Sequence, residues 1–283
     1  MMVVVAQRLL GSVSWGLKGR LAVGGGISFL DVVSDLVMVT SYLQDPKLAV
    51  YGVALLAMVA ASTLTQFVLV VAQNYKRPAR ILGEAFAALT GFKAALDGYR
   101  VGSGTIEDEF LMLSRESEHL ATKCIELCFE SIPGCVLQCY ALLRTEEITG
   151  QAVTSLMISA LSSGFAGAVI SFDFDVSPAN RKRAPAFYGY VPDGGTRTIV
   201  FACMLLNGTL LLLFRSISIA LLMSVGSVYF WGYWLIDVAL YFALKLFRRD
   251  FHYFVDVPGK TGLFVSFMCR FTIKMVTDVS RAS

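Results

Sequence analysis

The chain has 283 residues, of which 56% are hydrophobic and only 16% are charged. A soluble domain of this size usually carries about 25% charged residues, and its core does not need so much apolar surface. The composition therefore indicates an integral membrane protein, and the net charge of +3, which gathers mainly on one side of the expected membrane spans, argues against nucleic-acid binding.

The apolar residues are grouped into stretches of the roughly 20 residues that a helix needs to cross hydrocarbon. The expected spans, in chain order, are Leu21–Leu43, Ala49–Gln73, Lys123–Leu143, Gln151–Phe172, Thr198–Val225 and Ser227–Phe247. These stretches are longer than barrel strands of about 9–11 residues and lack their alternation. The sequence therefore predicts the all-α class, as a polytopic transmembrane bundle of about six full spans plus re-entrant or interfacial helices.

Two further segments have a helical pattern but are too short or too polar to be full spans. Arg80–Val101 is weakly apolar and contains Gly83 and Gly91, which indicates one interfacial or re-entrant helix. Leu263–Val279 carries charged residues at i, i+4 spacing and is expected to be a surface helix or a half-span. The chain 1–283 is thus predicted to be a single membrane domain, with a cytosolic or interfacial N-terminus (1–20), a bundle (21–247) and an interfacial or partial-span C-terminal segment (248–283).

Basic residues in the loops orient this bundle. With a cytosolic N-terminus, the cytosolic loops hold most of the Lys and Arg residues, whereas the outer turns hold only Lys47 and Arg144. Positive charge favours the cytoplasmic side of a membrane. We therefore expect a multi-pass protein with its N-terminus in the cytosol, located in the plasma membrane rather than in an internal one.

Polar residues at bilayer depth are informative because a charge at the centre of a helix costs at least about 2.5–3.5 kcal/mol. In the first span, Ser28 and Tyr42 share one face with two carboxylates. The candidate intramembrane residues are Asp31, Asp35, Glu126, Glu130, Gln138, Arg215 and Asp237. They either pair across helices and fix the packing, or line a path for something hydrophilic. Because carboxylates outnumber Arg215, full pairing requires protonation or contact with Lys123 or Lys245, which favours the functional interpretation.

Other site chemistries find little support in the sequence. Four cysteines lie on one stripe of the third span, at positions 124, 128, 135 and 139. We expect them to pack against a neighbouring helix rather than bind metal, since His119 and His252 are the only histidines. No nucleophile elbow, zinc-protease, P-loop or dinucleotide motif occurs, so neither an enzyme nor a cofactor is expected. Gly24–Gly26 is expected to allow close approach of helices.

Two segments resemble the XK-related protein family. FLDVVSDLVMVTSYL (Phe29–Leu43) is similar to the opening helix of that family, and IELCFESIPGCVLQCYALL (Ile125–Leu143) is similar to its glutamate–small–apolar–proline signature. The matching positions of the second segment are Glu130, Ser131, Pro133, Leu137, Gln138 and Tyr140, of which Ser131, Pro133 and Tyr140 are structural members of the motif. Gly134 stands where the family usually has Gln. The sequence ends where family members generally continue with further helices and a cleavable tail, so a divergent or truncated member is expected.

The resemblance implies phospholipid scrambling, the passive movement of lipids between leaflets along a polar intramembrane groove, with exposure of phosphatidylserine. Of the candidate path residues, only Asp31, Asp35 and Glu130 come from the matching segments. The expected partners are membrane phospholipids, together with a single-pass subunit or a second copy of the chain. Two alternatives stay open, namely a transporter or channel for a small ion or solute, and a partner subunit without transport activity. A polar stripe that faces lipid favours scrambling, and stripes that enclose an aqueous cavity favour solute transport.

Overall fold

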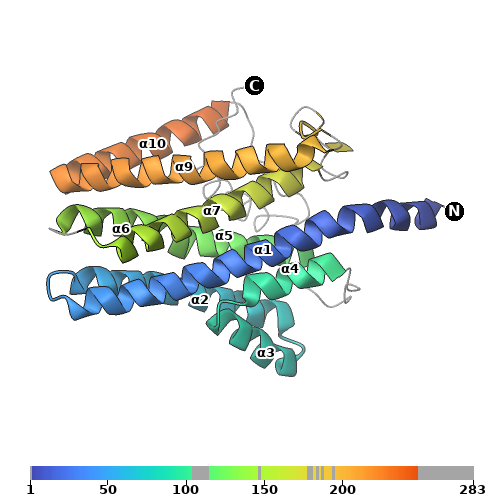
Figure 1. The fold of residues 1–283 in the computed structure, drawn as a ribbon, viewed down its shortest axis with the longest axis horizontal. Helices are drawn as coiled ribbons and strands as arrows, with labels where there is room; N and C mark the ends of the chain where they lie inside the picture. The colour runs from blue at the N-terminus through green and yellow to red at the C-terminus, as the bar shows by residue number, and fades with distance from the viewer. Residues whose placement is uncertain are drawn as a thin grey trace.

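The computed structural model describes residues 2–103, 115–145, 148–176, 181–182, 185, 188–192 and 195–247. Throughout these residues the regular structure is helical, and the helices lie side by side in an elongated bundle (Figure 1). The predicted all-α class is therefore confirmed. The expected C-terminal segment 248–283 lies outside the described residues.

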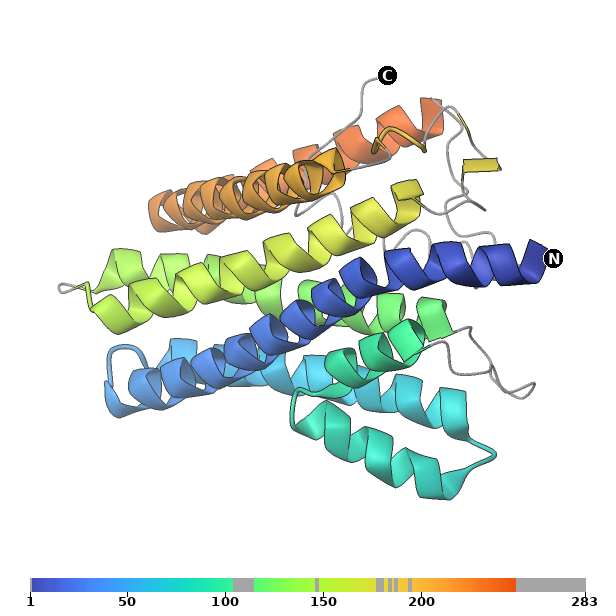
Figure 2. The same cartoon turned by 45° about the vertical axis from the view of Figure 1, so that its right-hand side comes forward.

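The helices follow one another with short connections where the connections are described. They are α1 (Met2–Gln44), α2 (Ala49–Asn74), α3 (Pro78–Leu89), α4 (Lys93–Ser103), α5 (Arg115–Glu126), the π-helix η1 (Leu127–Ser131), α6 (Ile132–Arg144), α7 (Gly150–Val176), α9 (Thr196–Val225) and α10 (Ser227–Phe247). The residues expected as a separate N-terminal segment belong to the same helix as the first span. α10 packs on α9, and together they form one edge of the bundle (Figures 1 and 2).

Among the described residues, five helices are long and apolar enough to cross a membrane. These segments are Ala22–Gln44, Ala49–Asn74, Gly150–Asp173, Thr196–Val225 and Ser227–Leu244. By length and composition the chain is thus an integral membrane protein. The other expected span corresponds to the continuous run α5–η1–α6, which lies beside α7 but carries Lys123, Glu126 and Glu130 and is less apolar than the five.

The segment expected to be an interfacial or re-entrant helix is a hairpin of two helices, α3 and α4, so the prediction of a single helix is wrong. α3 runs through Gly83 without interruption, and the break falls at Gly91, whose φ of +74° suits glycine. Phe92 stacks on Phe29 of α1 with ring centroids 4.8 Å apart, so the turn docks against the first span. Both open ends of the hairpin lie at the end of the bundle that holds the N-terminus, as a re-entrant element requires (Figure 2).

Small residues bring the helices into close contact, as the glycine run predicts. A Cβ atom on Gly25 would lie 2.5 Å from the Cβ of Ala95 in α4, and one on Gly24 would lie 2.8 Å from the ring of Phe165 in α7. Gly164 of α7 approaches α9 just as closely, because its Cβ would lie 2.8 Å from the backbone nitrogen of Thr209 and nearer still to the hydroxyl oxygen of that residue. These contacts fix the spacing of α1, α4, α7 and α9.

The cysteine stripe packs in the core, as expected. Cys124, Cys135 and Cys139 are buried in an apolar cluster with Leu127 and residues of α7 and α9. The described cysteines are all free thiols. Packing therefore explains why these thiols lie on one stripe.

Candidate functional site

The polar stripe of α1 faces the interior of the bundle. Asp31 and Asp35 are only 4% and 0% exposed, and Ser28 and Tyr42 on the same face are also buried. Apolar residues on the other faces of α1, such as Leu30 and Val37, are exposed. The helix therefore turns its carboxylates toward its neighbours and its aliphatic side chains outward, as lipid contact requires.

The two segments that carry the family resemblance meet at this stripe. The Nε2 atom of Gln138 donates a hydrogen bond to Oδ1 of Asp35 at 2.9 Å. The hydroxyl of Ser131 donates to Oδ2 of Asp31 at 3.4 Å. Side chains about 100 positions apart in the sequence thus form one site between α1 and η1–α6.

Glu130 reaches this site from the π-helical turn η1, where it is 5% exposed. Pro133 explains the turn, because proline lacks an N–H and its ring clashes with the carbonyl four residues earlier. The backbone N–H of Ile132 donates instead to the carbonyl of Leu127, a π-type bond. The widened turn changes the direction in which the side chains before Pro133 point. The sequence analysis identified Pro133 as part of the motif but did not predict the π-helix.

Serines of α7 complete the site, and the sequence analysis missed them. Ser159 donates to Oδ1 of Asp35 at 3.3 Å, and the hydroxyls of Ser34 and Ser155 are 2.8 Å apart. Ser155, Ser159 and Ser162 are buried on one face of α7. Their i, i+4, i+7 spacing could have indicated a polar face on α7. Serine costs little in a membrane helix, however, so its presence alone does not require a buried polar site.

Four oxygen atoms of the site lack a hydrogen-bond donor in the described part of the chain. They are Oδ1 of Asp31, Oδ2 of Asp35, Oε1 of Glu130 and Oε1 of Gln138. We call Asp31, Asp35 and Glu130 the core carboxylates. Leaving a buried acceptor unpaired costs about 1–3 kcal/mol, and more for a charged group. Such oxygen-rich sites are satisfied by bound protons or by a hard cation, which prefers oxygen ligands.

The remaining candidates pair with partners. Nζ of Lys123 lies 2.9 Å from Oε2 of Glu126 and donates a hydrogen bond to the hydroxyl of Ser28 at 2.5 Å. Lys123 therefore links the Ser28 end of the polar stripe of α1 to α5. Arg215 of α9 lies 3.7 Å from Asp237 of α10. The packing interpretation therefore fits Arg215 and Asp237, which join these two helices.

Tyr140, the aromatic member of the motif, also has a structural environment. Its ring makes an edge contact with Tyr51 at a centroid distance of 5.9 Å, and its hydroxyl accepts a hydrogen bond from Arg144 at 2.8 Å. A surface cavity of about 370 Å³ lies at this end of the bundle, and Tyr42, Arg144 and residues of the α6–α7 connection line it. The polar stripe of α1 therefore ends beside a surface cavity.

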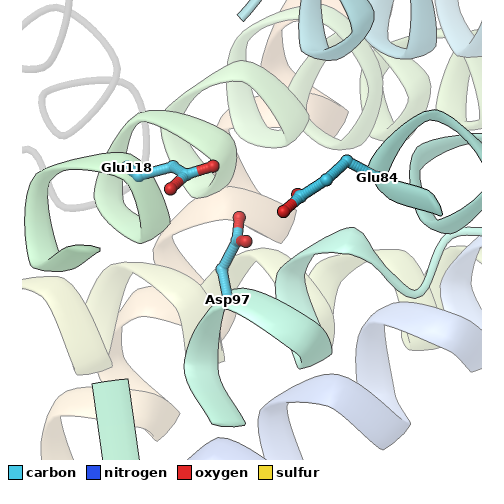
Figure 3. Close-up of side chains that lie close together, drawn as sticks. All are labelled: Glu84, Asp97 and Glu118. Carbon is cyan, nitrogen blue, oxygen red and sulfur yellow. The ribbon is translucent and has the colours of Figure 1, made fainter. Parts of the chain in front are cut away.

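A second buried charge cluster, which the sequence analysis missed, holds the hairpin. Nζ of Lys93 lies 2.8 Å from Glu84, 2.5 Å from Asp97 and 2.8 Å from Glu118, and the lysine is 0% exposed. Figure 3 shows the three carboxylates, from α3, α4 and α5, pointing toward one another. We call these four residues the lysine cluster.

The lysine cluster has the carboxylate spacing of a metal site, with ligand atoms within 4.8 Å of one another. The Lys93 ammonium, however, lies within hydrogen-bonding distance of all three carboxylates and takes the place that a cation would occupy. Burial raises the pKa of Asp97 to about 6, although Lys93 opposes this shift. Burial lowers the pKa of Lys93, but the three carboxylates outweigh it and leave that pKa raised.

Comparison with known proteins found no relative of the chain. No protein-family model matches the chain, and neither a curated protein nor a solved structure matches it. The fold and the site therefore define the class of protein by themselves: an α-helical, multi-pass integral membrane protein with a buried cluster of carboxylates between its helices.

Proposed function

We propose that the chain is a phospholipid scramblase similar to the XK-related proteins, which moves lipids passively between leaflets and exposes phosphatidylserine. The observation that carries the proposal is the meeting of the two resembling segments through Gln138–Asp35 and Ser131–Asp31. Their contact supports the proposal that they belong to one functional unit.

The polar stripe of α1 offers a path along the depth of the bundle. It runs from Ser28, which is bonded to Lys123, past Asp31 and Asp35 to Tyr42 beside the surface cavity. A lipid headgroup crosses bare hydrocarbon only at high cost, and fixed polar groups lower that barrier while the acyl chains stay in lipid. We assign the core carboxylates to this path, in a plasma-membrane protein with a cytosolic N-terminus.

The core carboxylates are enclosed, since none of them is more than 5% exposed. Scrambling through this site therefore requires α1 to separate from α2 or α7, the helices that pack against both α1 and η1, so that a headgroup can reach the carboxylates. The same enclosure favours a second candidate function, in which a proton or hard cation bound by the carboxylates is coupled to transport of a small ion or solute. The unpaired acceptors of the core carboxylates support that candidate.

Reconstitution into liposomes tests both candidates. The vesicles contain a fluorescent phospholipid that an impermeant reagent bleaches from the outer leaflet, and parallel vesicles contain a pH- or sodium-sensitive dye. The variants are Asp35→Asn and Glu130→Gln, which keep side-chain shape and remove charge. Asp173→Asn is the matched control, because this half-exposed carboxylate pairs with Arg20, which lies just before the span Ala22–Gln44 of α1.

Scrambling predicts bleaching beyond the outer-leaflet fraction for the unmodified protein and for Asp173→Asn, with a loss of at least tenfold in rate for both core variants. Bleaching that stops at the outer-leaflet fraction for folded protein contradicts the scramblase proposal. A dye response that disappears in the core variants then identifies ion-coupled transport. A folded protein that moves neither lipid nor ions leaves the partner-subunit interpretation.

A further inference from the structure

The outward face of α3 is apolar and has no partner in the described part of the chain. Leu82, Phe86 and Leu89 recur at i, i+4 and i+7, and each is about 70% exposed or more (76%, 69% and 72%). The opposite face, with Glu84 and Ala87, is buried against its neighbours. α3 packs on α2 and α4 and is the outermost helix on its side of the bundle (Figures 1 and 2).

Basic residues gather where this face begins. Lys76 and Arg77 connect α2 to α3, and Arg80 lies in the first turn of α3. Lys76 and Arg80 are exposed, and Nζ of Lys76 lies 5.5 Å from the ring of Tyr75, which is itself 64% exposed. Apolar residues on one face of a helix, with Lys, Arg and an aromatic residue at its edge, are typical of a helix that lies in the membrane interface.

The position of the hairpin gives this face a depth in the bilayer. α3 begins just after the α2 span ends at Asn74, which is the level of the headgroups. Its other end leads to Gly91 and to Phe92, which stacks on Phe29 inside the α1 span. α3 therefore slopes from the interface into the hydrocarbon, so its basic residues lie at phosphate level while Phe86 and Leu89 lie among acyl chains.

We propose that Lys76, Arg77 and Arg80 form a binding surface for anionic phospholipids of the leaflet at the N-terminal end of the bundle. The apolar face of α3 supplies the contact with the lipid chains, and the basic residues supply the attraction to the headgroups. Each Lys or Arg close to an anionic surface contributes about fivefold to lipid binding. The positive end of the α3 helix dipole lies at this turn and adds to the attraction. The proposal holds whether or not the protein scrambles lipid.

Native mass spectrometry of the full chain tests the headgroup part. The protein is exchanged into mild detergent with equal amounts of phosphatidylglycerol and phosphatidylcholine, and the retained lipids are counted. The test variant is Lys76→Gln/Arg77→Gln/Arg80→Gln, and the single variant Arg80→Gln provides a milder change. The matched control is Lys47→Gln/Arg144→Gln, which removes positive charge at the opposite end of the bundle.

We expect the unmodified protein and the control to retain phosphatidylglycerol in preference, the triple variant to lose at least tenfold of that preference, and Arg80→Gln to lose about fivefold. Unchanged retention by both α3 variants, or equal losses in the control, overturns the proposal. A spin label at Phe86→Cys, in a Cys128→Ser/Cys203→Ser/Cys269→Ser background, tests the apolar part in liposomes. Access to oxygen but not to a water-soluble nickel chelate is the expected result. Exclusion of both reagents would show that protein, from this chain or a second copy, covers the face instead.

Discussion

The lysine cluster allows a quantitative test of the fold. Replacing Lys93 with Met removes the ammonium and leaves three carboxylates, on Glu84, Asp97 and Glu118, buried against one another. Their side chains are each at most 3% exposed, so solvent does not screen the change. Breaking a buried ion pair by removing one partner costs about 3–5 kcal/mol. Because one ammonium serves three carboxylates, we expect Lys93→Met to lie at the upper end of that range.

The assay is thermal unfolding of the purified protein in detergent, followed by intrinsic fluorescence and by the monodisperse fraction in size-exclusion chromatography. For a chain of this length, 1 kcal/mol corresponds to roughly 2 °C, so a fall of about 8–10 °C in melting temperature is expected. Lys76→Met is the matched control, because it removes an exposed lysine near the same hairpin. Its melting temperature should change by less than about 1 °C.

A compensating variant separates lost charge pairing from lost packing. In Lys93→Met/Asp97→Asn/Glu118→Gln, two of the three carboxylates are neutral and Glu84 retains its contact with Arg100. Replacing buried ions by neutral groups of similar volume is often close to neutral for stability. This triple variant should therefore recover more than half of the lost melting temperature. A Lys93→Met protein that melts within 2 °C of the unmodified chain refutes the reasoning.

Two further predictions concern the same hairpin. The pKa of Asp97 is raised to about 6, so between its ordinary value of about 3.9 and 6 the folded protein binds a proton that the unfolded chain does not. The melting temperature should therefore rise as the pH falls from 7.5 to 5. The Asp97→Asn variant should lose part of that rise. Identical pH profiles for the variant and the unmodified protein would contradict the raised pKa of Asp97. Gly25→Val should separate α4 from α1 and lower the melting temperature, because even a Cβ atom at this position would lie 2.5 Å from Ala95. Gly26→Val should be tolerated, because a Cβ atom there meets open space. Equal melting temperatures for the two variants would contradict the packing.

Much of the fold follows from the sequence because crossing a membrane is a constraint on length. Stretches of about 20 apolar residues need no knowledge of their neighbours to be identified, and the described spans agree with them closely. The inward face of α1 also follows, since Asp31 and Asp35 are one turn apart and lipid contact is costly for both. The expected span Lys123–Leu143 is not among the five described spans, because it lies within the run Arg115–Arg144, whose charged residues contact other helices.

The lysine cluster could not be predicted because its contacts are not local. Lys93 and Asp97 are an i, i+4 pair that the sequence does show, but Glu118 lies 25 residues further along the chain and Glu84 lies on the other arm of the hairpin. The turn at Gly91 had to be recognised first. A weakly apolar segment with two glycines gave no means to decide which glycine ends a helix, and only the positive φ of Gly91 does so.

The contrast between the two buried acidic clusters bears on function. In the lysine cluster a cation lies within 2.8 Å of every carboxylate, so the charges hold α3, α4 and α5 together and need no ligand. Asp31 receives a hydrogen bond from Ser131, and Asp35 receives hydrogen bonds from Gln138 and Ser159. No described Lys or Arg forms an ion pair with Asp31, Asp35 or Glu130, and Lys123 pairs with Glu126 instead. The difference between the clusters is therefore the basic partner, which the lysine cluster has in Lys93 and which the core carboxylates do not have among the described residues; the proposed lipid or ion path rests on this difference.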